Sequence, residues 1–436
     1  MLPQVENIAG SKELRNKILF TLALLIVYRF GIHIPVPGVD GQAVSDFFDN
    51  AQNTLFGLFD MFSGGGLSRL SVFALGIMPY ISAAIIFELL VVVSPELERL
   101  KKEEGEAGRK KITQYTRYAT VLITLVQGTG IAFGLQNMTS PSGAPIVLDP
   151  GFLFIFTTVI TLSTGTIFIM WLGEQISEKG IGNGISLIIF SGIVARIPGA
   201  LSKTYRLLTS GEITIFLILI ALAVIIGVLA FICFMETSQR RIPIQYAKRM
   251  MGKRLYGGQS SHLPLRVNTA GVIPPIFASS ILMFPATIAN FSNMSWLQEI
   301  SAYFRPGGLA YTIVYVGLII FFCYFYTAII FDPKDIAENL KKQGGFIPGI
   351  RPGKNTKAYI DKVLSRITFW GALYVAAVCT VPMLIMQEMN MPFYLGGTAL
   401  LIVVGVSIDT MSQIQSYLIT NQYEGLMQKS KYKGKF

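Results

Sequence analysis

The chain has 436 residues, of which 52% are hydrophobic and only 14% are charged, and its formal net charge is +11. Soluble proteins carry about 25% charged residues, so this composition excludes a water-facing globule of the same length. It predicts an all-α polytopic membrane protein whose excess positive charge lies in its cytoplasmic loops.

Ten segments have the composition of membrane-spanning helices, each of which needs about 20 predominantly apolar residues. The first and the fifth are the weakest, because Arg29 and Arg196 interrupt them. In chain order the ten segments are 18–34, 70–93, 118–138, 152–172, 181–201, 213–235, 268–288, 309–331, 367–387 and 395–418.

The distribution of basic residues supports ten crossings with both termini in the cytoplasm. All of the 36 basic residues except Arg29, Arg69, Arg196, Lys203, Arg206 and Arg305 then lie on the cytoplasmic side. This asymmetry is the positive-inside pattern. If 181–201 did not cross, the basic loops 236–267 and 332–366 would lie outside. The pattern therefore predicts a multi-pass protein of an inner membrane.

Ten spans divide into an N-terminal half, 1–205, and a C-terminal half, 206–436, which ends in a tail, 419–436. Because each half holds an odd number of spans, halves of the same fold would be inverted relative to each other. Inverted repeats place the working site of many transporters near the middle of the membrane.

No motif for catalysis is present, so we expect neither an enzyme nor a cofactor or metal site. The two histidines, His33 and His262, are far apart, and neither a zinc-hydrolase motif nor a phosphate-binding glycine loop occurs. The cysteines Cys233, Cys323 and Cys379 each lie inside an apolar run and are expected to be small buried residues. Residues 1–17 lack the features of a removable signal peptide.

A break in helical character occurs at Gly64-Gly65-Gly66, because glycine loses the most backbone entropy when it is ordered. The apolar stretch Leu67–Phe73 that follows predicts a helix of about two turns, too short to cross a membrane. This helix is either a packed re-entrant connection or a movable stopper in a pore.

Isoleucines recur at helical spacing in three spans, as the pairs Ile81 and Ile85, Ile185 and Ile189, and Ile273 and Ile276. Each pair shares one helix face. Ordinary packing explains such pairs as well as a functional surface does. For the intramembrane charges Arg196 and Asp409 we expect structural salt bridges.

Loops 236–267 and 332–366 are long and basic. Their charge either sets the topology and contacts anionic lipids or forms a docking surface for a polyanionic or acidic partner such as RNA.

Seven stretches of the sequence resemble the SecY family, the channel subunits of the bacterial Sec protein-translocation complex. They include MFSGGGLSRLSVFALGIMPYISA (61–83), GEAGRKKITQYTRY (105–118), GIGNGISLIIFSGIVA (180–195), RRIPIQYAKR (240–249), LPLRVNTAGVIPPIFASSI (263–281), GGFIPGIRPG (344–353) and YLGGTALLIVV (394–404). They run through most of the chain in order.

The resemblance implies an hourglass of ten helices in two inverted halves, hinged between spans 5 and 6. At its waist a ring of apolar side chains would seal around an unfolded secretory polypeptide. Such a ring excludes hydrated ions by dewetting. The matching residues here are Ile81, Ile85, Ile189, Ile276 and Ile402.

The resemblance also implies a plug and a lateral gate. The plug would be residues 60–74, including Gly64, Gly65, Gly66, Leu67, Ser68, Arg69 and Leu70. Spans 2 and 3 would part from spans 7 and 8 to release transmembrane segments into lipid. Gln127 and Asn268 are the expected polar contacts across that seam, which signal peptides would enter.

Because the chain carries no energy source of its own, the resemblance implies a SecA-like ATPase motor or a ribosome as partner. The residues matching the docking surface are Arg240, Arg241, Lys253, Arg254 and Arg351. SecE-like and SecG-like small membrane subunits, unfolded preproteins and anionic lipids are further expected partners.

Two other interpretations stay open from the residues alone. One is a secondary transporter of a small solute with inverted repeats, which should hold several convergent polar groups at mid-membrane. The other is an insertase or scaffold without a pore.

Overall fold

The computed structural model describes residues 12–50, 55–136, 145–246, 249–251, 254–256, 260–291, 308–388 and 396–433. These residues are mostly helical. The helices are α2 (Lys12–Gly31), α3 (Gly41–Asn50), α4 (Leu55–Phe62), α5 (Met78–Val93), α6 (Pro95–Glu103), α7 (Gly105–Gln136), α8 (Phe152–Lys179), α9 (Gly184–Val194), α10 (Ile197–Thr209), α11 (Ile215–Thr237), α12 (Ile273–Phe291), α14 (Leu309–Ile330), α15 (Pro333–Lys342), α16 (Lys354–Glu388) and α17 (Gly397–Lys433).

The helices account for the ten expected spans. Among the described residues, seven helical segments are long and apolar enough to cross a membrane, and α5 with α6, bent by 96°, makes an eighth. The remaining expected spans coincide with α2 and with α12, whose apolar part is Ile273–Leu282. The ten-helix prediction is therefore confirmed.

Two predicted spans differ in detail from the structure. The second helix begins at Met78 instead of residue 70, with Pro79 in its first turn. The fifth span consists of α9 and α10, which are separated at Ala195 and Arg196. Pro198 lies in the first turn of α10, where its missing N–H breaks the ladder from α9 but fits a helix start.

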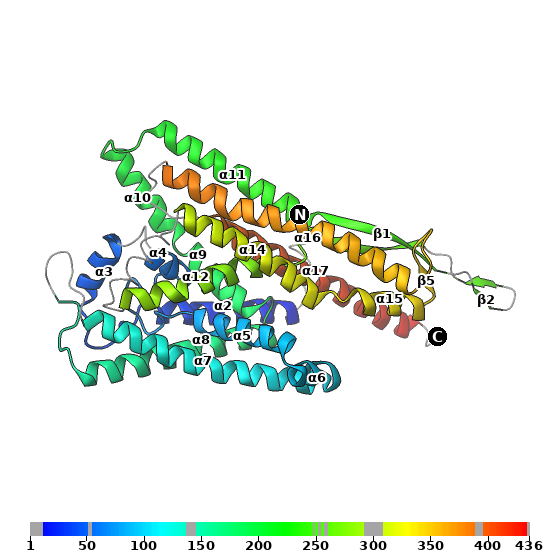
Figure 1. Cartoon of the computed structure of the whole chain (residues 1–436), viewed down its shortest axis with the longest axis horizontal. Helices are drawn as coiled ribbons and strands as arrows, with labels where there is room; N and C mark the ends of the chain where they lie inside the picture. Colours follow the sequence, from blue (N-terminus) through cyan, green and yellow to red (C-terminus); the bar gives the residue numbers. More distant parts are fainter. Residues whose placement is uncertain are drawn as a thin grey trace.

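Helices from the two ends of the chain form two groups (Figure 1). In one group α7 packs against α5 and α8, and in the other α16 packs against α14, α11 and α17. Two helices join the groups: α12 packs on α5 and α7, and α9 packs on α17. The surface between the groups is therefore lined by helices from both.

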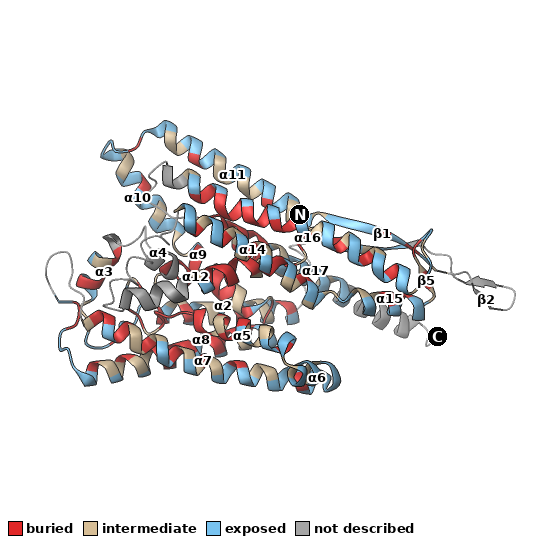
Figure 2. Ribbon diagram, in the orientation of Figure 1, coloured by how far each residue is buried: buried red, intermediate tan, exposed pale blue. Residues whose placement is uncertain are grey.

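Buried residues concentrate where the two groups meet, and the outer faces are exposed (Figure 2). We call the large apolar cluster between the groups the central cluster. The outer helix α11 buries only 11% of its apolar window. Such apolar, uncovered helices are what a lipid-facing surface requires.

The loop 236–267 forms antiparallel strands that extend away from the helices (Figure 1). They are β1 (Gln239–Tyr246), β2 (Arg249–Met251), β3 (Arg254–Tyr256) and β4 (Ser260–Arg266). Strand β1 pairs with β4 in the register Gln239↔Arg266 and also with β5 (Gly345–Phe346).

A second apolar cluster holds this sheet against α15 and the first turns of α16. We call it the cytoplasmic cluster. Its buried members are Ile242, Ile244, Leu265, Leu340, Ile347, Ile360 and Leu364. The two long basic loops therefore fold into one unit instead of remaining separate.

Candidate functional site

The five ring isoleucines all lie in the central cluster, and each is at most 7% exposed. Ile81 and Ile85 project from α5, Ile189 from α9, Ile276 from α12 and Ile402 from α17. Since α5 packs on α12 and α9 packs on α17, these four helices bring side chains from both groups into one apolar interior. None of the five lies on the outer, lipid-facing surface.

The predicted helix over Leu67–Phe73 is wrong. The structure has consecutive turns there, and Ser71 forms a β-bridge with Pro35. The helix fails because Leu70 adopts a left-handed φ of 42°, which a right-handed helix cannot contain.

Serine hydroxyls replace the missing helical hydrogen bonds of this 60–74 segment. The Leu67 amide donates to Ser63 Oγ, and the Phe73 amide donates to Ser71 Oγ, both at 3.2 Å. Such local side-chain bonds offer the backbone an alternative to helix. The glycines of the triplet provide the left-handed turn that starts the segment, with φ of 69° at Gly64.

Helices α2 and α9 hold the start of the 60–74 segment in place. Tyr28 Oη donates to the Ser63 carbonyl at 3.1 Å, and Arg29 Nη1 donates to the Gly64 carbonyl at 2.8 Å. A Cβ added at Gly64 would lie 2.9 Å from the Cα of Gly192, so only glycine fits on this side. The segment is thus fixed between two helices of the first group.

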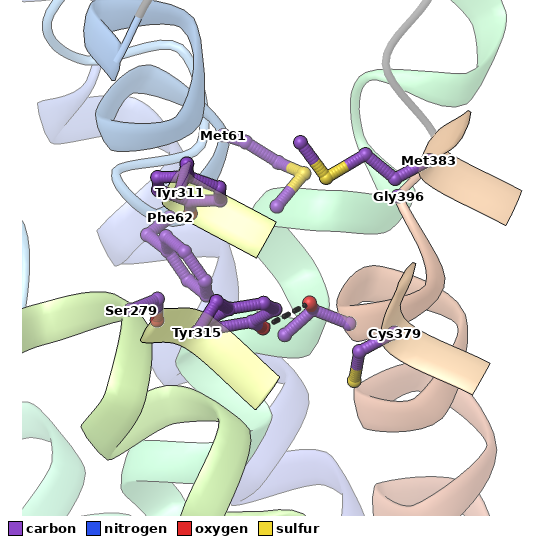
Figure 3. A pocket seen from close by; sticks show the side chains of 9 residues that line it. Met61, Phe62, Ser279, Tyr311, Tyr315, Cys379, Met383 and Gly396 are labelled. Carbon is purple, nitrogen blue, oxygen red and sulfur yellow. Dashed lines mark hydrogen bonds between the residues drawn. The ribbon is translucent and has the colours of Figure 1, made fainter. Parts of the chain in front are cut away.

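A small cavity of about 10 Å³, the size of one water molecule, separates α4 from the second group (Figure 3). Met61 and Met383 point toward one another across it, and Tyr315 Oη lies 2.9 Å from Thr398 Oγ1. Its lining residues are Met61, Phe62, Ser279, Tyr311, Tyr315, Cys379, Met383, Gly396 and Thr398. The base of the 60–74 segment therefore touches both helix groups.

The two expected seam residues do not contact each other. Asn268 Nδ2 donates to Glu236 Oε1 at 2.6 Å and to the Gly271 carbonyl at 3.1 Å, both within its own half. Gln127 Oε1 is buried on α7 without a hydrogen-bond partner. The Asn268 amide therefore makes its described hydrogen bonds within the C-terminal half, and its role as a polar contact across the seam stays a prediction.

Lys102 on α6 feels negative charge from the second half. Lys102 Nζ donates to Glu98 Oε1 at 2.7 Å. The pKa of Lys102 is raised, mainly by this bond and further by the negative charges of Asp332 and Asp335 at the start of α15. A weak electrostatic attraction therefore acts between α6 and α15.

The expected salt bridges of Arg196 and Asp409 are confirmed. Arg196 Nη1 lies 3.3 Å from Asp60 Oδ2, and Asp409 Oδ1 lies 3.4 Å from Arg266 Nη1. Sequence reasoning assigned no role to Asp60, although a lone carboxylate in an otherwise apolar stretch was a signal that it needs a partner.

The expected docking residues fall on the extended cytoplasmic unit. Arg240 and Arg241 are exposed on β1, and Arg351 is exposed just before α16. Arg254 begins β3, and Lys253 lies outside the described residues.

Comparisons with known proteins agree on one family. A family model described as SecY matches residues 71–411. The protein translocase subunit SecY of Escherichia coli strain K12 is 51% identical over 429 residues, which cover 98% of this chain and 96% of the relative.

Two solved structures share the fold. One is reported with the finding that the plug domain of the SecY protein stabilises the closed state of the translocation channel and maintains a membrane seal. It has a TM-score of 0.65 at 20% identity and 93% coverage of both chains. The other is Sec61 in the canine ribosome-channel complex from the endoplasmic reticulum, with a TM-score of 0.62 at 18% identity and 93% coverage of both chains.

Proposed function

Because this chain belongs to the SecY family, it is the protein-conducting channel subunit of a translocase, and we propose that the five buried isoleucines form its constriction. The chain is a multi-pass protein of the bacterial inner membrane. The proposed ring consists of Ile81, Ile85, Ile189, Ile276 and Ile402.

The observation that carries this proposal is the burial of all five side chains in one apolar cluster built from both helix groups. Branched aliphatic side chains exclude hydrated ions because a narrow apolar constriction dewets. They also form no strong bond to any particular side chain, so an unfolded polypeptide of any sequence can slide past them.

We further propose that the 60–74 segment is the plug and that the lateral gate lies between α5 and α7 on one side and α12 and α14 on the other. The plug assignment is supported by the packing of α4, which carries Met61 and Phe62, on α12 of the opposite group. The gate assignment is supported by the packing of α12 on α5 and α7 and by the unpaired Gln127 Oε1 at that boundary. Transmembrane segments and signal peptides would leave through this seam.

The basic cytoplasmic unit is the proposed docking surface for a SecA-like motor or a ribosome, with both chain termini on the same side. The exposure of Arg240, Arg241 and Arg351 supports this role. SecE-like and SecG-like subunits would complete the translocase, and the halves 1–205 and 206–436 would hinge between α10 and α11.

The alternative of a small-solute transporter is not supported. The curated relatives of this chain are translocase subunits. The proposed ring positions hold only aliphatic side chains. A solute site would need convergent polar groups there.

The test is replacement of all five isoleucines by serine, followed by reconstitution with the partner subunits. We expect idle membranes to conduct small ions, because polar side chains keep the constriction wet. Matched serine replacements at the lipid-facing residues Ile215, Leu219, Leu222, Ile226 and Phe234, which are exposed on α11, serve as the control. Unchanged idle conductance in the ring variant would remove the assignment.

A further inference from the structure

Asp60 is a buried carboxylate at the start of the plug. It lies in the last turn of α4 and is 3% exposed. Its Oδ2 atom faces the Arg196 guanidinium at 3.3 Å. Among the described residues, Arg196 is the one cation within salt-bridge distance of this carboxylate. The nearby Arg29 donates to the Gly64 carbonyl instead.

The other oxygens of Asp60 hold the plug backbone. Oδ1 accepts the Ser68 amide at 2.7 Å, and the Asp60 carbonyl accepts the Gly65 amide at 2.9 Å and Ser63 Oγ at 3.1 Å. A bond to a charged acceptor is about twice as strong as one between neutral groups. One carboxylate therefore joins the middle of the plug to a cation on a neighbouring element.

Arg196 lies at the junction of two helices. It stands at the break between α9 and α10, and α10 is followed within five residues by α11, the first helix of the second half. Helix α10 therefore lies on the covalent path between the halves. A rotation of α10 about the break would carry the guanidinium away from Asp60.

We propose that Arg196 is the positioning residue that latches the plug through Asp60 and that couples plug release to movement between the halves. This inference rests on the proposed role of residues 60–74 as the plug. When α10 moves, Asp60 becomes an unpaired buried charge, which is strongly unfavourable. The plug carrying it then leaves its site for water.

The test compares R196Q, D60N and the double variant D60N/R196Q. Idle ion conductance is measured in reconstituted bilayers. Plug exposure is measured as the labelling rate of a cysteine at Leu67, which is buried here, with an impermeant thiol reagent in a background lacking Cys233, Cys323 and Cys379. R206Q is the matched control, since Arg206 is an exposed cation on the same helix.

We expect R196Q to raise both conductance and labelling about tenfold or more, because it strands the Asp60 charge. The double variant is expected to return close to the level of D60N, since a neutral asparagine needs no cation and its carbonyl still accepts the Ser68 amide. R196K should lie near the wild type. If Arg196 only supported the fold, adding D60N to R196Q would not restore low conductance and slow labelling.

Equal leak in R196Q and R206Q, or a double variant that leaks more than R196Q, would overturn the latch. If R196Q fails to accumulate in the membrane, the double variant decides: accumulation with conductance close to that of D60N supports the latch, and failure to accumulate contradicts it. Deletion of residues 63–71 distinguishes failure of the latch from failure of the plug assignment. If the deletion leaks while R196Q does not, the latch alone is wrong, and if neither leaks, the plug assignment fails as well.

Discussion

Glycines set how closely the 60–74 segment, the proposed plug, approaches the helices around it. A Cβ at Gly165 on α8 would collide with the Val72 carbonyl oxygen, and one at Gly31 on α2 would collide with the Phe73 ring. On α9, a Cβ at Gly192 would lie 3.0 Å from the Gly64 Cα. Side-chain methyls would push the plug out of its site from three directions.

Gly165→Ala is therefore expected to raise idle ion conductance and to lower the free energy of unfolding by about 1–3 kcal/mol, the usual cost of overpacking. Backbone atoms of Val72 would have to shift, unlike the tip of a flexible side chain. Conductance of the reconstituted channel and thermal unfolding of the purified protein check the two effects.

Gly227→Ala is the matched control, because an added Cβ there on α11 meets nothing within 4 Å. It should leave conductance unchanged, and helix propensity favours alanine over glycine. A tightly closed Gly165→Ala channel would show that the plug does not depend on this close approach.

At the scale of elements, the seam between α6 and α15 carries opposite charges on its two sides. Lys102→Glu places a carboxylate beside Asp332 and Asp335 and next to Glu98. Like charges then repel across the cytoplasmic end of the seam. We expect easier opening, seen as increased export of preproteins with weakened signal sequences.

The effect of Lys102→Glu should shrink at high salt, because exposed charges are screened beyond about 10 Å at 0.1 M ionic strength. Lys110→Glu, at an exposed lysine near the start of α7, makes the same charge change and should leave export unchanged. Equal export by the two variants would mean that the attraction at the seam does not restrain the gate.

The spans could be predicted from the sequence because apolar length alone determines which segments can cross a bilayer. The turns of the 60–74 segment could not be predicted from hydrophobic periodicity. They depend on hydrogen bonds to serine hydroxyls and to the Asp60 carboxylate. The sequence marked Arg196 as an interruption of the fifth span but did not show that the helix divides there into α9 and α10, because hydropathy averages over a bend. The Asn268 bond to Glu236 joins residues 32 apart that no local pattern relates.

At the scale of the whole molecule, the proposed docking surface belongs to a unit with its own apolar core, separate from the central cluster that holds the proposed ring. Arg351 is exposed there, next to the turn before α16, and its carbonyl accepts Thr356 Oγ1 at 3.1 Å. The side chain itself is left free to meet an acidic partner.

Arg351→Glu is expected to abolish motor-driven export while the protein still folds and inserts. The reversed charge repels an acidic partner surface. Because position 351 is exposed, the glutamate stays in water, and the unfolding temperature should not change. ATP-dependent translocation of a preprotein into proteoliposomes measures the loss. Lys357→Glu, at an exposed lysine in the first turns of α16, is the control. Normal export by the Arg351 variant would make this loop a topology signal only.

Helix α16 runs from Lys354 to Glu388 and contains Pro382 near its C-terminal end. Its early residues Ile360 and Leu364 sit in the cytoplasmic cluster, and its later residues Val375 and Val378 sit in the central one. At about 1.5 Å per residue it is a rod of roughly 50 Å. If the proposed motor docks on the basic unit, a force applied there would pass along one continuous helix as far as Val378, before Pro382 breaks its hydrogen-bond ladder.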